Sequence, residues 1–129
     1  MAVGLSAGIA NAILDALCRS VAWSEPDEVW VALHTGDAGA AGTANAATET
    51  TRKQATFGTA ASAGAISNTV ALTWTSVAGT EDYTHFSAWS ASAAGTFLFS
   101  GTVAANSVTS GDTFSVAIGD LDVSLAVAS

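Results

Sequence analysis

The chain has 129 residues and a formal net charge of −8, which comes from eleven acidic and three basic side chains. This length suits one hydrophobic core, so we expect a single domain over residues 1–129. Charged residues make up only 11% of the chain, well below the usual share of about 25%. The negative charge disfavours binding to nucleic acid or anionic membranes, whereas a surface of small neutral side chains suits packing against other protein copies.

The first segment has the spacing of an amphipathic helix. Its apolar side chains recur at four-residue steps, at Leu5, Ile9, Ile13 and Leu17. This spacing predicts a helix over residues 5–21 that ends before Pro26, because proline cannot continue a helix. Cys18 lies in this segment, and we expect a buried small side chain rather than a reactive thiol. The sequence lacks a signal-peptide pattern and any long apolar run, which predicts synthesis in the cytoplasm and no membrane span.

The remaining residues, 28–127, have the pattern of short strands. In residues 28–35 the side chains alternate with the period of two expected of a strand. Further strands, separated by turn-forming residues, are predicted at 53–57, 68–75, 84–89, 97–103, 113–118 and 122–127. Short strands at this spacing indicate an all-β fold, an antiparallel β-sandwich of about seven or eight strands with one N-terminal α-helix.

Three intervening segments lack strand periodicity. Residues 58–67 and 88–94 consist almost entirely of small residues, and we expect them to be loops inside the domain. Residues 36–50 are also rich in Gly, Ala, Asn and Thr. Their length predicts an extended loop or arm that a partner could order.

A histidine, a hydroxyl and a carboxylate meet at the end of the first predicted strand, in His34, Thr35 and Asp37. A nucleophilic triad needs such groups in contact with an activated nucleophile, but the sequence has no Gly-x-Ser-x-Gly turn. We therefore favour a turn in which Gly36 adopts a positive φ and the Asp37 or Thr35 side chain bonds nearby amides. The prediction is that the protein is not an enzyme and has no catalytic residue; a hydrolase acting through His34 and Asp37 is the disfavoured alternative.

The sequence offers weak candidates for metal binding. The histidines His34 and His85 lack the spacing of a zinc site. Asp120 and Asp122 lie on one face of a predicted strand, and Asp112 could join them as a calcium ligand, although solvated turn residues are the favoured interpretation. No metal or cofactor is predicted. The sequence has no phosphate-binding glycine motif, so we do not expect a nucleotide cofactor.

The four tryptophans, Trp23, Trp30, Trp74 and Trp89, could either fill a core or form a platform on which sugars stack. Trp30 and Trp74 lie in strand patterns with apolar neighbours, which favours core filling for these two. Trp23 and Trp89 are therefore the candidates for glycan contact.

Two stretches of the chain resemble a family of small virion structural proteins of tailed phages. They are LHTGDAGAAGTAN at residues 33–45, and SGDTF followed by AIGDLDV near the C-terminus. That family has an LHTGDPG and GTANE string after the first strand, then an Arg-Gln-Ala run, a Phe-Gly pair, a THFGLWDA strand and a closing GDLDV strand. This chain has RKQA, FG, THFSAWSA and GDLDV in the same order, over residues 28–126. It departs from the pattern at Ala38, Ala46, Ser87 and Ser90.

The resemblance implies a non-enzymatic component of a tailed-phage virion, made in the host cytoplasm, and it carries over no site residue. Members are often labelled tail fibre or minor structural proteins. A compact domain of this length spans on the order of tens of ångströms, which slightly favours capsid decoration over a tail fibre or tail-tip adhesion module that binds a host receptor or glycan. Expected partners are further copies, as a trimer or another symmetric cluster, and major capsid or tail proteins.

Overall fold

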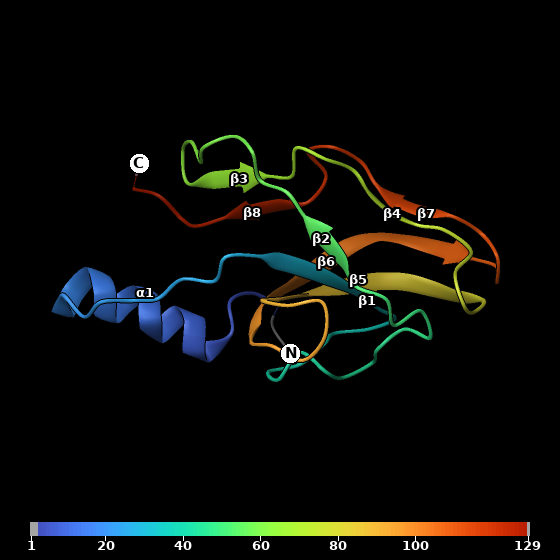
Figure 1. Cartoon of the computed structure of the whole chain (residues 1–129), viewed down its shortest axis with the longest axis horizontal. Coiled ribbons are helices and arrows are strands. Elements are labelled where there is room, and N and C mark those ends of the chain that lie inside the picture. Colours follow the sequence, from blue (N-terminus) through green and yellow to red (C-terminus); the bar gives the residue numbers. More distant parts are fainter. Residues whose placement is uncertain (1–2, 129) are drawn as a thin grey trace.

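The computed structural model describes residues 3–128, which contain one helix and eight strands (Figure 1). The elements are α1 (Ala7–Arg19), β1 (Val29–His34), β2 (Lys53–Ala55), β3 (Ala65–Ser67), β4 (Leu72–Trp74), β5 (Glu81–Trp89), β6 (Phe97–Val108), β7 (Phe114–Val116) and β8 (Asp122–Ser124). All strand pairs are antiparallel. The predicted antiparallel sandwich with an N-terminal helix is therefore confirmed. Within the described residues, no helix is long and apolar enough to cross a lipid bilayer.

Helix α1 is capped at both ends. The Ser6 hydroxyl accepts a hydrogen bond from the Ile9 amide at 3.3 Å, as N-cap residues do. At the other end Ser20 has a left-handed φ of 57°, and the Val21 amide donates to the Asp15 carbonyl, which closes the helix well before the proline.

The helix projects beyond the end of the sheets (Figure 1). No side chain of its residues 7–19 is buried. Cys18 is exposed, so the expectation that this thiol is buried is wrong. The apolar spacing correctly indicated a helix but not how much of it the rest of the chain covers.

The first layer of the sandwich is a four-stranded sheet with the order β2-β1-β5-β6. In its centre, Leu33 lies opposite Phe86 and Val31 opposite Ala88. The chain just before α1 extends this sheet, because the Ser6 amide donates to the Leu98 carbonyl in β6 at 2.8 Å.

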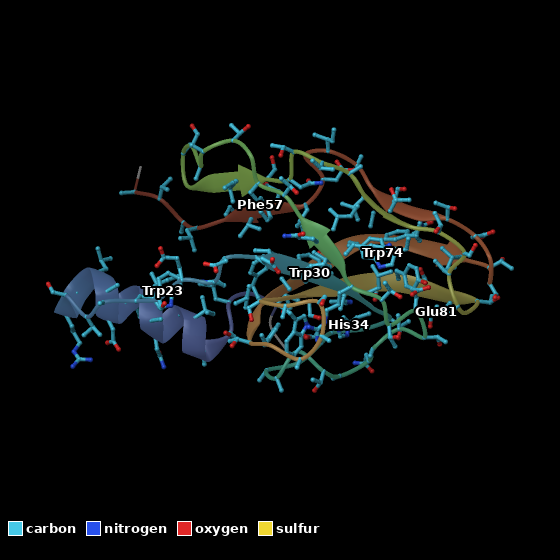
Figure 2. All side chains as sticks on the ribbon, in the orientation of Figure 1. Trp23, Trp30, His34, Phe57, Trp74 and Glu81 are labelled. Carbon is cyan, nitrogen blue, oxygen red and sulfur yellow. The ribbon has the colours of Figure 1, made fainter. Side chains whose placement is uncertain are left out.

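The second layer consists of two separate ribbons, β3-β8 and β4-β7. The core lies between the layers, where Trp74 in β4 is 1% exposed (Figure 2). The Phe114 ring lies 5.8 Å from the Trp74 ring and 5.1 Å from the Tyr83 ring, measured between centroids. Aromatic contacts of this kind add to the hydrophobic stabilisation of a small core. Trp74 thus fills the core, as predicted.

Trp30 does not fill the core. It alternates with the buried Val31 and lies half-buried on the other face of β1. Its Nε1 donates to the Glu28 carboxylate at 2.6 Å. The expectation of core filling is wrong for this residue because the strand offers only one face to the space between the layers.

Several predicted strand boundaries shift. Strand β3, Ala65–Ser67, lies inside residues 58–67, which were predicted to be a loop. It forms because Ile66 pairs with Val123 of β8. Strand β6 continues to Val108, beyond its predicted end, and the predicted loop at 88–94 begins only after β5 ends at Trp89.

Residues 36–50 form a long loop without a helix or strand of its own, and this loop does not extend from the domain as an arm. The segment folds back on β1: the Ala47 amide donates to the Leu33 carbonyl at 3.1 Å, and Ala38 and Ala47 are buried. Gly42, with a φ of +75°, lies so close to Phe97 that a Cβ there would be 2.5 Å from the ring. The small residues of this segment permit its close packing against the rest of the domain.

Asn68 joins the two ribbons of the second layer. This residue is 1% exposed. Its Nδ2 donates to the carbonyls of Val70 and Ala117, and its Oδ1 accepts the amides of Gly119 and Leu121. Every hydrogen-bonding position of the amide is therefore used.

Asn68→Leu keeps the side-chain size but leaves buried amides and carbonyls without partners. We expect the free energy of unfolding to fall by on the order of 3 kcal/mol. Urea unfolding followed by tryptophan fluorescence measures this change. A loss well under 1 kcal/mol would contradict the role given to the Asn68 amide.

Tyr83 shows the opposite situation, a buried polar group without a hydrogen-bond partner in the described residues. Its side chain is fully buried, and its hydroxyl has no hydrogen-bond partner among residues 3–128. Burial, together with Glu81 and Glu49, raises the pKa of Tyr83 to about 12. Tyr83→Phe removes a buried polar group and keeps the ring, so we expect the free energy of unfolding to rise by about 1 kcal/mol. The same urea titration would refute this if Tyr83→Phe were less stable than the natural chain.

Candidate functional site

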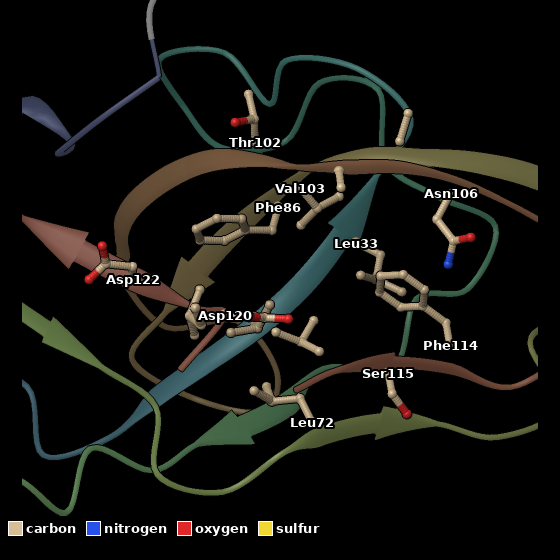
Figure 3. Close-up of a pocket in the computed structure, with 15 residues that line it drawn as sticks. Leu33, Leu72, Phe86, Thr102, Val103, Asn106, Phe114, Ser115, Asp120 and Asp122 are labelled. Carbon is tan, nitrogen blue, oxygen red and sulfur yellow. The ribbon is translucent and has the colours of Figure 1, made fainter. Parts of the chain in front are cut away.

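A groove of about 690 Å³ opens between β6 of the first sheet and the β7-β8 side of the second layer (Figure 3). Its floor includes the buried side chains of Leu33, Phe86 and Phe114. The volume falls in the range of about 300 to 1000 Å³ typical of small-ligand sites.

A bulge in β6 shapes one wall of the groove. β5 and β6 pair at His85–Thr102 and again at Tyr83–Asn106. Between these pairs β5 contributes Thr84 alone, whereas β6 contributes residues 103–105, and all three line the groove. Extra residues of this kind bend a strand away from its neighbour, and they are frequent beside binding sites.

The rim of the groove is polar. Figure 3 shows Asn106 at one end, Asp122 at the other and Asp120 between them. All three side chains are exposed. The two carboxylates accept hydrogen bonds, and the amide both donates and accepts. A buried apolar floor below a few polar groups is the usual composition of a small-molecule site.

The wall that carries Asp120 and Asp122 depends on a buried residue. The Asn68 side chain holds the amides of Gly119 and Leu121, each at 3.0 Å. These bonds fix the turn between β7 and β8, so the two carboxylates project from a rigid support.

Asp112 does not join the two rim acids. Its Oδ2 accepts the Thr109 amide at 2.9 Å within a turn, which is the structural role favoured for these acids. In the part of the chain that the structure describes, no group of three or more His, Cys, Asp or Glu side chains is gathered as a metal ion would need.

The predicted His34, Thr35 and Asp37 group does not form a triad. The Asp37 carboxylate accepts the Gly39 amide at 2.8 Å, two residues further on, as the turn interpretation requires. The positive φ, however, is that of Gly39 (74°) and not that of Gly36. The Thr35 hydroxyl donates to the Asn45 carbonyl. Neither the Thr35 nor the Asp37 side chain forms a hydrogen bond with His34.

His34 instead bonds a serine that sequence reasoning missed. Its Nε2 lies 2.7 Å from Ser87 Oγ, and its Nδ1 lies 2.8 Å from the Ala44 carbonyl. Because a carbonyl only accepts, Nδ1 carries the proton and the Ser87 hydroxyl donates to Nε2. Ser87 has no exposed surface and also accepts from Trp89 Nε1. These bonds use both ring nitrogens of His34 and the Ser87 hydroxyl, so the pair links β1, β5 and the loop after β1.

The face of β5 that carries Trp89 is also covered. The Arg52 guanidinium lies 4.4 Å from the centre of the Trp89 ring, and the Phe97 ring lies 5.4 Å from it. Arg52 donates to the carbonyls of Ala91 and Ala94, each at 2.8 Å, so it is fixed in place. Trp89 is therefore not the open sugar platform considered from the sequence, and Trp23 is half-buried.

A small β-sandwich with a polar-rimmed groove is the architecture of a structural or binding module. The sequence model of the family described as podophage GP4 fiber I protein gp80 matches residues 4–124. The chain belongs to this family and is a structural protein of the phage virion. The family description agrees with the fibre alternative and gives no support to capsid decoration. No curated protein matches the chain.

The buried His34 makes stability depend on pH. Burial lowers the pKa of His34 below its ordinary value of 6.5, opposed by the hydrogen bond to Ala44. Below about pH 6.5 the unfolded chain binds a proton that folded His34 resists, so stability decreases as the pH falls. We expect the free energy of unfolding of the natural chain to fall more between about pH 7.5 and 5.5 than that of His34→Gln, measured in urea.

His85→Gln is the matched control. The charge of His85 also contributes to lowering the pKa of His34, but burial is the larger cause, so this variant should keep most of the pH dependence. An equal decline in the natural chain and in His34→Gln would contradict the assignment of this pH dependence to His34.

Proposed function

We propose that this protein is a non-enzymatic adhesion module of a virion fibre and that its groove binds a host surface glycan. The groove is the observation that carries this proposal. It combines an apolar floor, formed by Leu33, Phe86 and Phe114, with the hydrogen-bonding rim of Asn106, Asp120 and Asp122. Sugars present apolar ring faces and many hydroxyls, which match such a surface.

The charge of the groove restricts the class of sugar. Asp120 and Asp122 both line it, and the chain carries a net charge of −8. This field repels phosphorylated or uronic-acid sugars. The groove therefore selects neutral sugars or sugars with a free amine, whose ammonium group the carboxylates can bind.

The family match supports the fibre setting, because the printed family description is that of a fibre protein. Binding at a host surface is a role that such a position on the virion allows. The buried state of His34 and Ser87 favours binding without catalysis. Attachment to tail proteins, rather than to the capsid lattice, follows from the same proposal.

The test is glycan-array and calorimetric binding of the full chain to neutral, amino and acidic oligosaccharides. We expect binding to neutral or amino sugars, and Asp120→Asn should weaken it by about tenfold or more, since hydrogen bonds to charged groups contribute about 1.5–3 kcal/mol. Ala105→Trp, which fills the groove without removing a polar group, should abolish binding.

Asp27→Asn is the matched control, because Asp27 is exposed and does not line the groove. It removes one carboxylate from the chain and should leave the affinity unchanged. Equal affinities of the natural chain and Ala105→Trp, or a preference for acidic sugars, would refute the proposed groove specificity.

A further inference from the structure

A second hollow lies on the face of the four-stranded sheet that points away from the core. It is lined by Ala32, which alternates along β1 with the core residue Val31, and by residues of the folded-back segment 42–50. Its volume is about 270 Å³, slightly below the range of about 300 to 1000 Å³ typical of ligand sites. This hollow, here called the Arg52 pocket, therefore suits one small chemical unit.

The Arg52 side chain is held in one position by two kinds of contact. The central carbon of its guanidinium lies 4.4 Å from the centre of the Trp89 ring, an arrangement in which a cation and a ring attract each other. Its Nη1 donates to the carbonyls of Ala91 and Ala94, each at 2.8 Å. A side chain that is already fixed loses little conformational entropy when a ligand binds to it.

The loop that supplies these two carbonyls is itself closed. The Ser90 amide donates to the Thr96 carbonyl at 3.0 Å, and the Thr96 amide donates to the Ser90 hydroxyl at 2.8 Å. Ala94 has a φ of 52°, which is uncommon for a residue with a Cβ. Such strain persists only where the surrounding structure enforces it, and it is frequent in segments that clamp a ligand. The loop is thus a rigid support for the Arg52 guanidinium.

The guanidinium of Arg52 has donors that the fold does not use. An arginine carries five N–H bonds, and the two on Nη1 are directed to the two carbonyls. Nε and Nη2 form no hydrogen bond with any residue from 3 to 128. Their N–H bonds lie side by side on one edge of the planar group, which is the geometry that holds both oxygens of a carboxylate.

The charge of Arg52 also lacks an acidic partner in the described chain. The sequence has eleven acids, yet the ion pair found within residues 3–128 joins Arg19 and Asp15 and leaves Arg52 out. Burial lowers the pKa of Arg52, because partial removal from water disfavours the cation. A bound carboxylate supplies the missing negative charge.

One acid, Glu49, lines the Arg52 pocket and is already engaged elsewhere. Glu49 is 9% exposed, and its two carboxylate oxygens accept the amides of Ala78 and Thr51 at 3.1 and 3.3 Å. Backbone amides that donate to a carboxylate stabilise its charge. Arg52 is therefore the side chain that selects the charge of a ligand in this pocket.

We propose that the Arg52 pocket binds a small organic acid, with Nε and Nη2 of Arg52 donating to the two oxygens of its carboxylate. Thr43 and Thr50 are exposed and line the pocket, so their hydroxyls bond the rest of the ligand. The ligand is about the size of one sugar or one amino acid. This inference goes beyond the groove, because the two sites share Leu33 alone among their lining residues and favour ligands of opposite charge.

The test uses the full natural chain and heteronuclear NMR of the arginine Nε–H groups, since the chain has two arginines, Arg19 and Arg52. The probes are glucuronate as a sugar acid, N-acetylglycine as an amino-acid type of acid, glucose as the neutral counterpart of glucuronate, and inorganic sulfate. We expect the Arg52 signal to move and saturate with at least one of the two acids, with a Kd on the order of 1 mM. The tighter of the two acids identifies the source of the carboxylate, and glucose should leave the signal in place.

Two substitutions of Arg52 separate its charge from its geometry, with affinities measured by calorimetry. Arg52→Lys keeps the charge but loses the parallel donors, so the acid that binds should do so at least about tenfold more weakly. Arg52→Gln should abolish binding. Arg19→Gln is the matched control, because it removes the same charge from an exposed helix position outside the pocket, and it should keep the natural affinity. Tryptophan fluorescence checks that each variant keeps the folded core.

The Arg52 pocket and the groove can fail independently. Ala105→Trp fills the groove and should leave the carboxylate titration unchanged. The groove is intact in Arg52→Gln, so acidic-sugar binding that this variant loses belongs to the Arg52 pocket and not to the groove.

An Arg52 signal that neither acid moves would overturn the proposal, and this outcome requires no variant. So would an equal shift with glucose, sulfate binding as tight as that of the carboxylates, or an Arg52→Lys variant with the natural affinity.

Discussion

The hydrogen bonds of one buried amide, that of Asn68, hold together the thinner layer of this sandwich. The ribbons β3-β8 and β4-β7 are not paired with each other, so the layer has no continuous ladder of backbone hydrogen bonds. Asn68 replaces that ladder by bonding both the segment just before β4 and the turn between β7 and β8. The same bonds fix the wall of the groove, and so the core and the binding surface depend on one side chain.

The sequence predicted the fold class because large side chains alternate clearly where the layers meet. Leu72 and Trp74 in β4 are both buried and separated by an exposed residue, which is the pattern that period-two reasoning detects. Strand β3 was missed because its small and aliphatic residues acquire strand geometry from pairing with β8, a contact distant in sequence. Composition alone indicated a loop at residues 36–50 but not that its small residues would pack closely against β1.

The candidate site was predictable only in part. Asp120 and Asp122 were singled out from the sequence and both line the groove, although Asp120 lies in the turn before β8 and not on a strand face. Their relation to Phe86 and Phe114 depends on a bulge in β6 that leaves no mark in the alternation of residues. His34 was also singled out, yet its partner Ser87 lies 53 positions away and is brought to it by the pairing of β1 with β5. Local motifs indicate which side chains are available, whereas long-range pairing decides which of them meet.

The bulge in β6 has a second effect besides opening the groove. β6 is the outermost long strand of its sheet, and the segment before α1 covers only its residues 98–100. A straight, uncharged outer strand invites another chain to add to it edge to edge. Displacement of residues 103–105 interrupts the regular row of backbone donors and acceptors that such an incoming strand would need. Wherever many copies of the chain come together, this irregularity protects the uncharged edge of β6 from uncontrolled pairing with further strands.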